Sequence, residues 1–311
     1  MQRSTEIDFV RFFLIIAVVL VHIVYFGTVH PEIKESTLAV LMPTFLVITG
    51  YLVNARKSVT QYALYLIRIF IPYAIMVAGF SVLSRYMPVR DGLTELSLKA
   101  VLGKIFITSI GPYWFLQTMI VCGICYYACF RPLNDRLGKV SWLAVFALTL
   151  ILMALFTPVV SIKAVPYYFI GVVLRQTNVR FASFFRKSPY VILPMLAVLC
   201  RKELHDWGYI SILMAVYCSI SFLLWVNGFA CRTKSYKRML YVGANTLPIY
   251  LFHPVFTMAA KYYQPLFGFD RTGILHALAT IAIAIVGSIL IARIMDLTRL
   301  SYVFCKPRIL R

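Results

Sequence analysis

Long apolar runs alternate with short polar connections along this chain, and most of these runs are long enough, as helices, to cross about 30 Å of hydrocarbon. Ten runs can be placed, and they cover residues 9–26, 38–54, 64–84, 112–130, 141–158, 164–178, 189–202, 207–229, 241–260 and 274–295. The seventh run is short and has Pro189 and Pro194 near its start, which disfavours a continuous helix. The pattern predicts an all-α, polytopic integral membrane protein with about ten transmembrane helices and a single membrane domain over residues 1–311.

Composition excludes a soluble protein. Hydrophobic residues make up 61% of the chain and charged residues only 14%, whereas roughly a quarter of the residues of a soluble domain are charged. The first run is about 18 residues long and no small-residue cleavage site follows it, so we expect it to remain as the first span and not to be removed as a signal peptide.

Charge predicts the orientation of the spans. The net charge of +20 could suggest nucleic acid, but the basic residues occur in short clusters between apolar runs. With the N-terminus inside, 21 of the 31 lysines and arginines, Arg3 among them, fall on the inner side, and seven of the 11 acidic residues fall outside. Because cytoplasmic loops carry the Lys/Arg excess, we expect both ends to be cytoplasmic, no nucleic-acid partner, and, in a bacterium, a location in the plasma (inner) membrane.

The seven cysteines predict neither a disulfide framework nor a metal site. Cys122, Cys125 and Cys129 recur at helical spacing inside an apolar run, without a second Cys/His pair. A metal site is the alternative, but buried cysteines more often act as small hydrophobic residues. We expect packing, no metal and no permanently bound cofactor.

Arg11 and His22 are the most informative residues, because both lie on the first apolar run. Eleven residues of α-helix amount to three turns plus about 20°, so the two side chains share a helix face and lie about 16 Å apart along the axis. A charge exposed to lipid costs at least ~2.5 kcal/mol, so such groups usually face a bundle interior. A hydrogen-bonded packing role is the alternative for His22.

Asp8 precedes Arg11 by three residues, so the two side chains can pair at the cytoplasmic boundary. This pair is either a topology anchor with its counter-ion or an oriented guanidinium for an anionic ligand. Arg56, Lys57 and Arg68 stand at the same predicted level on neighbouring segments and could complete a phosphate-binding mouth.

Five segments, in order, resemble the acyltransferase-3 family of membrane enzymes, which move acyl groups from acyl-CoA to hydroxyls of cell-envelope glycans and lipids. They are the Asp8-Phe9-Val10-Arg11 opening, with ten residues between Arg11 and His22, FLVITGYL (45–52), YLIRIFIPY (65–73), GPYWFLQTM (111–119) and GANTLPIYLFHP (243–254). The chain departs from the family pattern at Phe12, where glycine is usual, at Thr49, where serine is usual, and at Tyr65, the first place of a common Arg-x-x-Arg pair. No C-terminal esterase-like domain follows, so the resemblance implies the standalone form.

The resemblance implies an acyl-CoA-dependent O-acyltransferase, in the first instance an O-acetyltransferase, whose acceptor is a hydroxyl of an envelope or surface glycan or of a lipid-linked glycan. Acyl-CoA would place its phosphates at Arg11 and Arg68, and its thioester would reach His22. Burial favours the neutral imidazole, which can accept a proton, so His22 would be a general base or would briefly carry the acyl group.

The acceptor side is expected from residues of later spans. Trp114 and Gln117 share a helix face and offer an aromatic ring and an amide, although tryptophan at an interface is also a common bilayer anchor. His253 and Tyr250 are secondary site residues by resemblance, and Thr49 joins this substrate-contacting set. A proline kink packed by polar partners, near Pro248, is the alternative for the His253 segment. His253 could also be the base, with His22 structural.

The remaining histidines, His30, His205 and His276, fall in outer loops or at a span edge, where we expect solvated side chains. Two rival classes remain. Intramembrane His and Arg beside proline-broken helices also describe a transporter or flippase for a polar or anionic envelope precursor, although no inverted repeat is visible. A purely structural membrane protein is the third class, and the aligned polar residues disfavour it.

Overall fold

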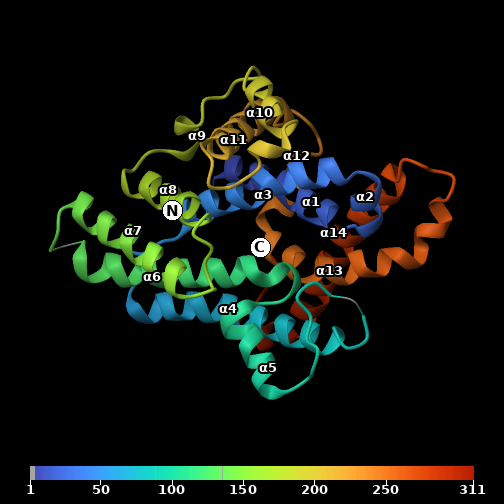
Figure 1. Cartoon of the computed structure of the whole chain (residues 1–311), viewed down its shortest axis with the longest axis horizontal. Helices are drawn as coiled ribbons and strands as arrows, with labels where there is room; N and C mark the ends of the chain where they lie inside the picture. Colours follow the sequence, from blue (N-terminus) through green and yellow to red (C-terminus); the bar gives the residue numbers. More distant parts are fainter. Residues whose placement is uncertain (1–3, 88, 135) are drawn as a thin grey trace. The chain divides into compact units, whose positions relative to one another are not determined.

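The computed structural model describes residues 4–87, 89–134 and 136–311, and over these ranges the chain forms α-helices joined by turns and short 3₁₀ or π segments (Figure 1). Arg3 and Asp135, two of the charges counted above, lie outside the described residues. The α-helices are α1 (Thr5–Val21), α2 (Val24–Val29), α3 (Pro31–Leu52), α4 (Val59–Leu83), α5 (Leu98–Gly103), α6 (Trp114–Leu133), α7 (Lys139–Phe156), α8 (Val165–Gln176), α9 (Phe181–Phe184), α10 (Ile192–Leu199), α11 (Ile210–Ala230), α12 (Tyr236–Ala244), α13 (Thr246–Tyr263) and α14 (Ile274–Leu297).

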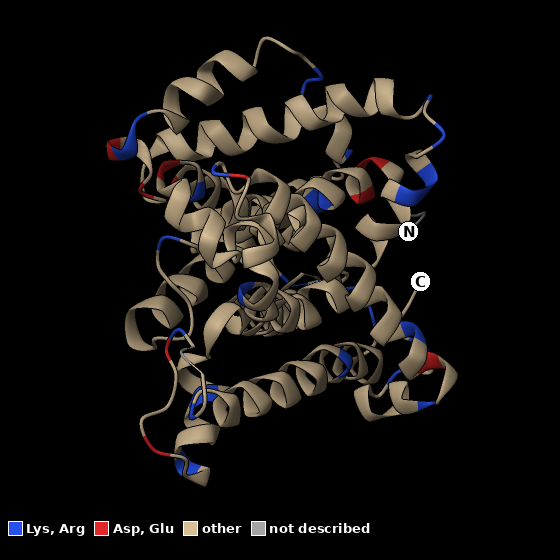
Figure 2. Cartoon of the chain, turned by 90° about the vertical axis from the view of Figure 1, so that its right-hand side faces the viewer, with Lys and Arg blue, Asp and Glu red and all other residues tan. Residues whose placement is uncertain are grey.

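Several helices have the length and apolarity of membrane spans. Within the described residues there are six such segments, namely Pro31–Leu52, Val59–Leu83, Leu98–Leu133, Lys139–Phe156, Ile210–Ala230 and Ile274–Leu297. Charged residues gather mainly in connections and at helix ends, while the middles of the long helices are largely uncharged (Figure 2). The helical class is confirmed and the protein is a multi-pass membrane protein, whereas the count of ten spans and the cytoplasmic position of both ends stay predictions.

The seventh and ninth apolar runs are not single long helices. Run 189–202 contains α10, a helix of 8 residues, which is about 12 Å long and therefore shorter than the hydrocarbon layer. Run 241–260 is divided at Asn245, where α12 ends and α13 begins.

The first apolar run is also interrupted, and the expectation of one helix over residues 9–26 is wrong at its C-terminal end. Helix α1 ends at Val21 with His22 as its C-cap, and α2 begins at Val24. The backbone N–H of His22 donates to the Val19 carbonyl at 3.1 Å instead of continuing the α-helical ladder to Val18. The Val18 carbonyl accepts instead from the ring Nδ1 of His22, at 2.6 Å. The imidazole thus satisfies a carbonyl that the helix end leaves open.

The described helices gather into two compact units. Unit 1 contains the N-terminal part of the chain as far as Phe45, Asn178–Ser301 and Pro307–Arg311, and unit 2 contains Leu46–Thr177 and Tyr302–Lys306. The single-domain expectation for residues 1–311 stays a prediction.

In unit 1, helix α1 packs against α12, α13 and α11, and α13 packs along α14 (Figure 1). Ser4 caps α1 by accepting from the Ile7 N–H. Gly243 allows the closest approach, because a Cβ on this residue would collide with the backbone carbonyl of Asp8. Glycine therefore fixes the contact between α12 and the start of α1.

In unit 2, a pair of glycines makes a similar close crossing. A Cβ on Gly50 of α3 would collide with the Tyr168 carbonyl, and a Cβ on Gly171 of α8 would collide with the Val47 carbonyl. Small residues are the usual means by which membrane helices approach closely. Gly50 lies in the FLVITGYL segment, so this part of the motif serves helix packing.

Candidate functional site

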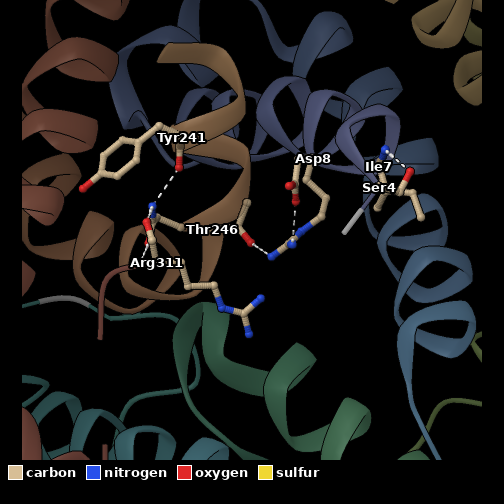
Figure 3. A network of polar contacts seen from close by, with 8 residues as sticks. Ser4, Ile7, Asp8, Tyr241, Thr246 and Arg311 are labelled. Carbon is tan, nitrogen blue, oxygen red and sulfur yellow. Dashed lines mark hydrogen bonds and ion pairs between the residues drawn. The ribbon is translucent and has the colours of Figure 1, made fainter. Parts of the chain in front are cut away.

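The Arg11 side chain joins the first turns of two helices that are far apart in the sequence. Its Nη1 lies 3.4 Å from Asp8 Oδ1, and its Nη2 donates to the Thr246 hydroxyl at the first position of α13 (Figure 3). The Arg11 side chain is 17% exposed and the Asp8 side chain 7% exposed. The carboxylate fits this position, because the N-terminal turn of a helix favours negative charge. The guanidinium is therefore held in a fixed direction between α1 and α13.

His22 is held with a defined tautomer. A carbonyl can only accept, so Nδ1 is the protonated nitrogen that donates to the Val18 carbonyl at 2.6 Å. In the neutral ring, Nε2 then carries the lone pair. A partly exposed imidazole with a fixed Nδ1–H and an accepting Nε2 has the geometry of a general base or nucleophile.

His253 is held in the same way by its own helix, α13. Its Nδ1 donates to the carbonyls of Tyr250, at 2.8 Å, and Ile249, at 3.2 Å. Pro254 explains this arrangement, because it has no N–H and leaves the Tyr250 carbonyl four residues earlier without its helical donor. The proline that frees a carbonyl for the histidine is therefore Pro254 and not Pro248, which the sequence had suggested. His253 is fully buried, and its Nε2 has no hydrogen-bond partner among the described residues.

The two histidine rings pack against each other, with centroids 5.1 Å apart and an interplanar angle of 67°. On α13, Thr246, Tyr250 and His253 follow at helical spacing, so one face of this helix meets both Arg11 and His22 of α1. The Tyr250 ring lies 5.7 Å from the His253 ring and is buried. Asp8, Arg11, His22, Tyr250 and His253 are thus brought together along one helix pair, and the common face expected for Arg11 and His22 agrees with this arrangement.

The other predicted cationic contacts belong to unit 2. Lys57 places its Nζ 4.5 Å from the centroid of the Tyr65 ring, so a cation stands over the residue at which the family's arginine is missing. Arg68 donates from Nε to the Cys305 carbonyl at 3.1 Å. Arg56 is exposed in the turn before α4. A common phosphate mouth of these residues with Arg11 stays a prediction.

The predicted acceptor residues Trp114, Gln117 and Thr49 also lie in unit 2. Trp114 begins α6 and is partly exposed, whereas Gln117 is buried and its amide donates to the Ile105 carbonyl at 3.5 Å. This amide donor is occupied by the protein itself, which weakens the expectation of a sugar contact. Thr49 lies on α3 immediately before Gly50 and is partly exposed.

The expectation that all loop histidines are solvated is wrong for His276. This residue lies in the first turn of α14, is 1% exposed, and its Nε2 donates to the Ala260 carbonyl at 3.2 Å. Its ring packs between those of Tyr25, at 5.6 Å, and Tyr263, at 5.5 Å. His276 therefore belongs to the packing of α14 on α13.

The site contains residues that the sequence did not single out. Thr246 and Pro254 lie inside the quoted GANTLPIYLFHP segment, and their signals were a hydroxyl at the start of a helix and a proline directly after histidine. Asn245, in the same segment, is buried and binds the backbone of Arg311. Arg311 itself carries no signal, because only the folded chain brings it to Asn245.

Comparison with protein families gives one match over most of the chain. The acyltransferase-3 family model, described as an acyltransferase domain, matches residues 4–293. No curated protein matches the chain, and no solved structure matches it either. The matched range begins just before α1 and ends within α14, so it includes the Arg11–Thr246 contact and both histidines.

Proposed function

Because the chain belongs to the acyltransferase-3 family, we propose that this membrane acyltransferase is an O-acyltransferase that uses acyl-CoA, with acetyl-CoA as the first candidate donor. The proposed acceptor is a hydroxyl of a cell-envelope or surface glycan, free or lipid-linked. In a bacterium the enzyme would lie in the plasma membrane. The observation that carries the proposal is the α1–α13 pair, which aligns a fixed guanidinium and two fixed imidazoles on one face.

The donor binds at Arg11. A guanidinium presents paired N–H donors that match phosphate oxygens, and Asp8 and Thr246 hold this one in a single direction. Acyl-CoA carries several phosphates, so it needs more cations than one. Arg68, Arg56 and Lys57 are the further cationic contacts in the proposal.

His22 accepts the proton of the attacking hydroxyl. The hydroxyl oxygen bonds to the thioester carbonyl carbon as its proton moves to Nε2 of His22, and the carbon–sulfur bond then breaks. The proton passes from His22 to the departing sulfur, so the products are an ester and CoA thiol. In the alternative relay, Nε2 attacks the thioester carbonyl carbon and the carbon–sulfur bond breaks, so CoA leaves as the thiolate and an acyl-imidazolium forms at His22. The hydroxyl oxygen then bonds to the acyl carbon, the bond to Nε2 breaks, and the hydroxyl proton passes to the CoA thiolate. The fixed Nδ1–H supports both routes, because it leaves Nε2 as the reactive nitrogen.

His253 supports the protonated state of His22. Its ring lies against that of His22, and its Nε2 is a buried acceptor without a partner among the described residues. An imidazolium formed at His22 therefore lies close to a hydrogen-bond acceptor, which stabilises its positive charge. Tyr250 contributes its carbonyl to the His253 ring, which fixes this acceptor in place. Trp114, Gln117 and Thr49 are the proposed acceptor contacts.

The decisive experiment uses the purified full-length chain in lipid nanodiscs with acetyl-CoA labelled in the acetyl group. We expect release of CoA thiol and transfer of the label to added envelope glycan, or slow thioester hydrolysis without an acceptor. Transport of a precursor into sealed vesicles that contain the chain, with no consumption of acetyl-CoA, would instead support the flippase alternative. The mass change of surface polysaccharide in a deletion strain would identify the acceptor.

The Arg11→Ala variant tests donor docking. We expect the affinity for CoA to fall by roughly tenfold or more, because removing one partner of a mostly buried charge pair costs about 2–5 kcal/mol at an interface. The measurement is CoA binding by isothermal titration in nanodiscs, with thermal melts to verify folding.

Two further variants control this prediction. Arg11→Lys keeps the charge but loses the planar fork, and should retain part of the affinity. Arg293→Ala removes an exposed arginine of α14 and should leave CoA affinity unchanged. Equal affinity of the Arg11→Ala variant and the unmodified protein would remove Arg11 from the docking site.

A further inference from the structure

The segment Pro307–Arg311 returns to unit 1 and docks there through polar side chains. Asp296 accepts from the backbone N–H groups of Ile309, at 2.7 Å, and Leu310, at 3.1 Å. Asp296 lies in the last turn of α14, where the helix macrodipole disfavours a carboxylate. The two N–H groups offset this unfavourable interaction. Binding of the segment therefore accounts for an aspartate at this position. Ile309 is buried in the contact.

Asn245 holds the end of the segment. Its Oδ1 accepts from the Arg311 N–H at 2.8 Å, and its Nδ2 donates to the Arg311 carbonyl at 3.4 Å and to the Tyr241 carbonyl at 2.8 Å (Figure 3). Asn245 is 1% exposed. A single buried amide therefore satisfies both backbone groups of Arg311 and fixes where its side chain begins.

Residues Asn245 and Thr246 bring two arginines to the same place. Asn245 binds the backbone of Arg311, and Thr246, the next residue, accepts from the guanidinium of Arg11. The Cα atoms of adjacent residues are about 3.8 Å apart, so both arginines are anchored within one short stretch at the N-terminus of α13. Figure 3 shows the Arg311 side chain extending below Thr246. This helix terminus adds further positive potential.

The two arginines differ in their electrostatic environment. Arg11 is mostly buried and has Asp8 as its carboxylate partner. Arg311 is exposed, and no acidic side chain pairs with its guanidinium within the ranges the structure describes. Asp296, the carboxylate that binds the segment, accepts from the backbone N–H groups of Ile309 and Leu310. The positive charge of Arg311 is thus held, through its backbone, beside that of Arg11. The N–H donors of the Arg311 guanidinium are available to a ligand.

We propose that Arg311 is the accessible guanidinium of a two-arginine anion site in which Arg11 is the buried one, and that the site binds a phosphate or diphosphate group. The assignment of this group to acyl-CoA rests on the proposed function. Asn245 and Asp296 are positioning residues, which hold the segment and so aim Arg311. The segment lies outside the residues matched by the family model, 4–293.

The test compares Arg311→Gln with Arg308→Gln in the full-length protein in nanodiscs. Both variants remove one exposed positive charge from the same segment, but only Arg311 is held by Asn245. We expect Arg311→Gln to weaken CoA binding about tenfold, as loss of a charge-assisted phosphate contact does, and Arg308→Gln to change it less than twofold. Binding or turnover of acetyl-pantetheine, which lacks the phosphates, should be the same in both variants and in the unmodified protein.

Each outcome decides the proposal. Equal losses in the two variants would indicate general electrostatic attraction and overturn it, as would unchanged CoA affinity in Arg311→Gln. If the unmodified protein does not bind CoA, the proposed donor fails, and inorganic pyrophosphate becomes the probe. A selective loss of pyrophosphate binding in Arg311→Gln still supports the anion site, and no selective loss overturns it.

Asn245→Ala provides an independent test of the positioning role. Releasing the backbone of Arg311 should weaken CoA binding to a similar extent, and the Asn245→Ala/Arg311→Gln double variant should bind no more weakly than Asn245→Ala alone, because both changes act through one contact. Additive losses would overturn the positioning role. Arg311→Gln alters only an exposed side chain, so its result remains interpretable if Asn245→Ala does not fold.

Discussion

Replacement of His22 with alanine is expected to reduce acyl transfer by about 10²–10⁴-fold, the usual contribution of a positioned general base. The reason is that Nε2 is the only basic nitrogen on this ring once Nδ1–H is committed to the Val18 carbonyl. Without it, the hydroxyl proton has no acceptor at this position. The measurement is label transfer from acetyl-CoA by the purified variant, together with its thermal melting curve.

Structural and chemical effects of this change can be separated. The imidazole also completes the C-terminal end of α1, so alanine removes a hydrogen bond that contributes about 1 kcal/mol. His22→Asn offers an N–H donor to the same carbonyl but no base, and we expect it to fold normally and remain inactive. His30→Ala removes a ring that hydrogen-bonds to the Thr272 carbonyl and packs on Phe26, and it should keep full activity.

Two results would contradict the assignment to His22. Undiminished transfer by His22→Ala would end it, and full loss in His253→Ala with retained activity in His22→Ala would make His253 the base. Rapid quenching followed by peptide mass analysis distinguishes the two routes for His22. An acetylated His22 peptide that forms and decays at the rate of turnover supports the relay, and transfer without any such adduct supports direct attack.

Gly243→Ala is expected to destabilise the protein and to reduce activity, although alanine is normally the better helix residue. A Cβ at this position would collide with the backbone carbonyl of Asp8, and a backbone atom cannot rotate away. Forced overpacking typically costs 1–3 kcal/mol, which exceeds the gain of about 1 kcal/mol from helix propensity. Helices α12 and α1 must then move apart, and this displaces Asp8, the residue that orients Arg11.

Gly228→Ala is the matched control for this prediction. Gly228 also lies in a helix of unit 1, but a Cβ there meets no atom within 4 Å. This variant should be neutral or more stable by up to ~1 kcal/mol. Thermal melting and label transfer are measured for both variants. A Gly243→Ala protein as stable and active as the unmodified chain would show that the α1–α12 contact does not position Arg11.

The helical class, most helix positions and the alignment of Arg11 with His22 could be predicted because they follow from local spacing. Apolar runs set where helices form, and the 3.6-residue period sets which residues share a face. The break at His22 could not be predicted in this way. It depends on the His22 ring, which donates to the Val18 carbonyl in place of a backbone N–H. The apolar pattern continues unchanged through that point.

The family motifs indicated that His253 matters but not how it is held. Its ring is fixed by the Tyr250 carbonyl, which lacks a helical donor because the residue four positions later is Pro254. This spacing can be recognised in the sequence once the helix is known. The approach of His253 to His22 is different, because more than two hundred residues separate them. No local pattern encodes which of several apolar helices packs against α1.

By itself, therefore, the sequence determined an apolar, helical, membrane-embedded chain with an arginine and a histidine on one helix face. Only the tertiary structure decided that α13 meets this face, that Thr246 and His253 are the contacts, and that Asn245 receives Arg311. The physical reason is that helix formation depends on neighbouring residues, whereas the choice of packing partner depends on shape. Glycines such as Gly243 permit one close approach, and buried polar groups such as Asn245 must find their partners there.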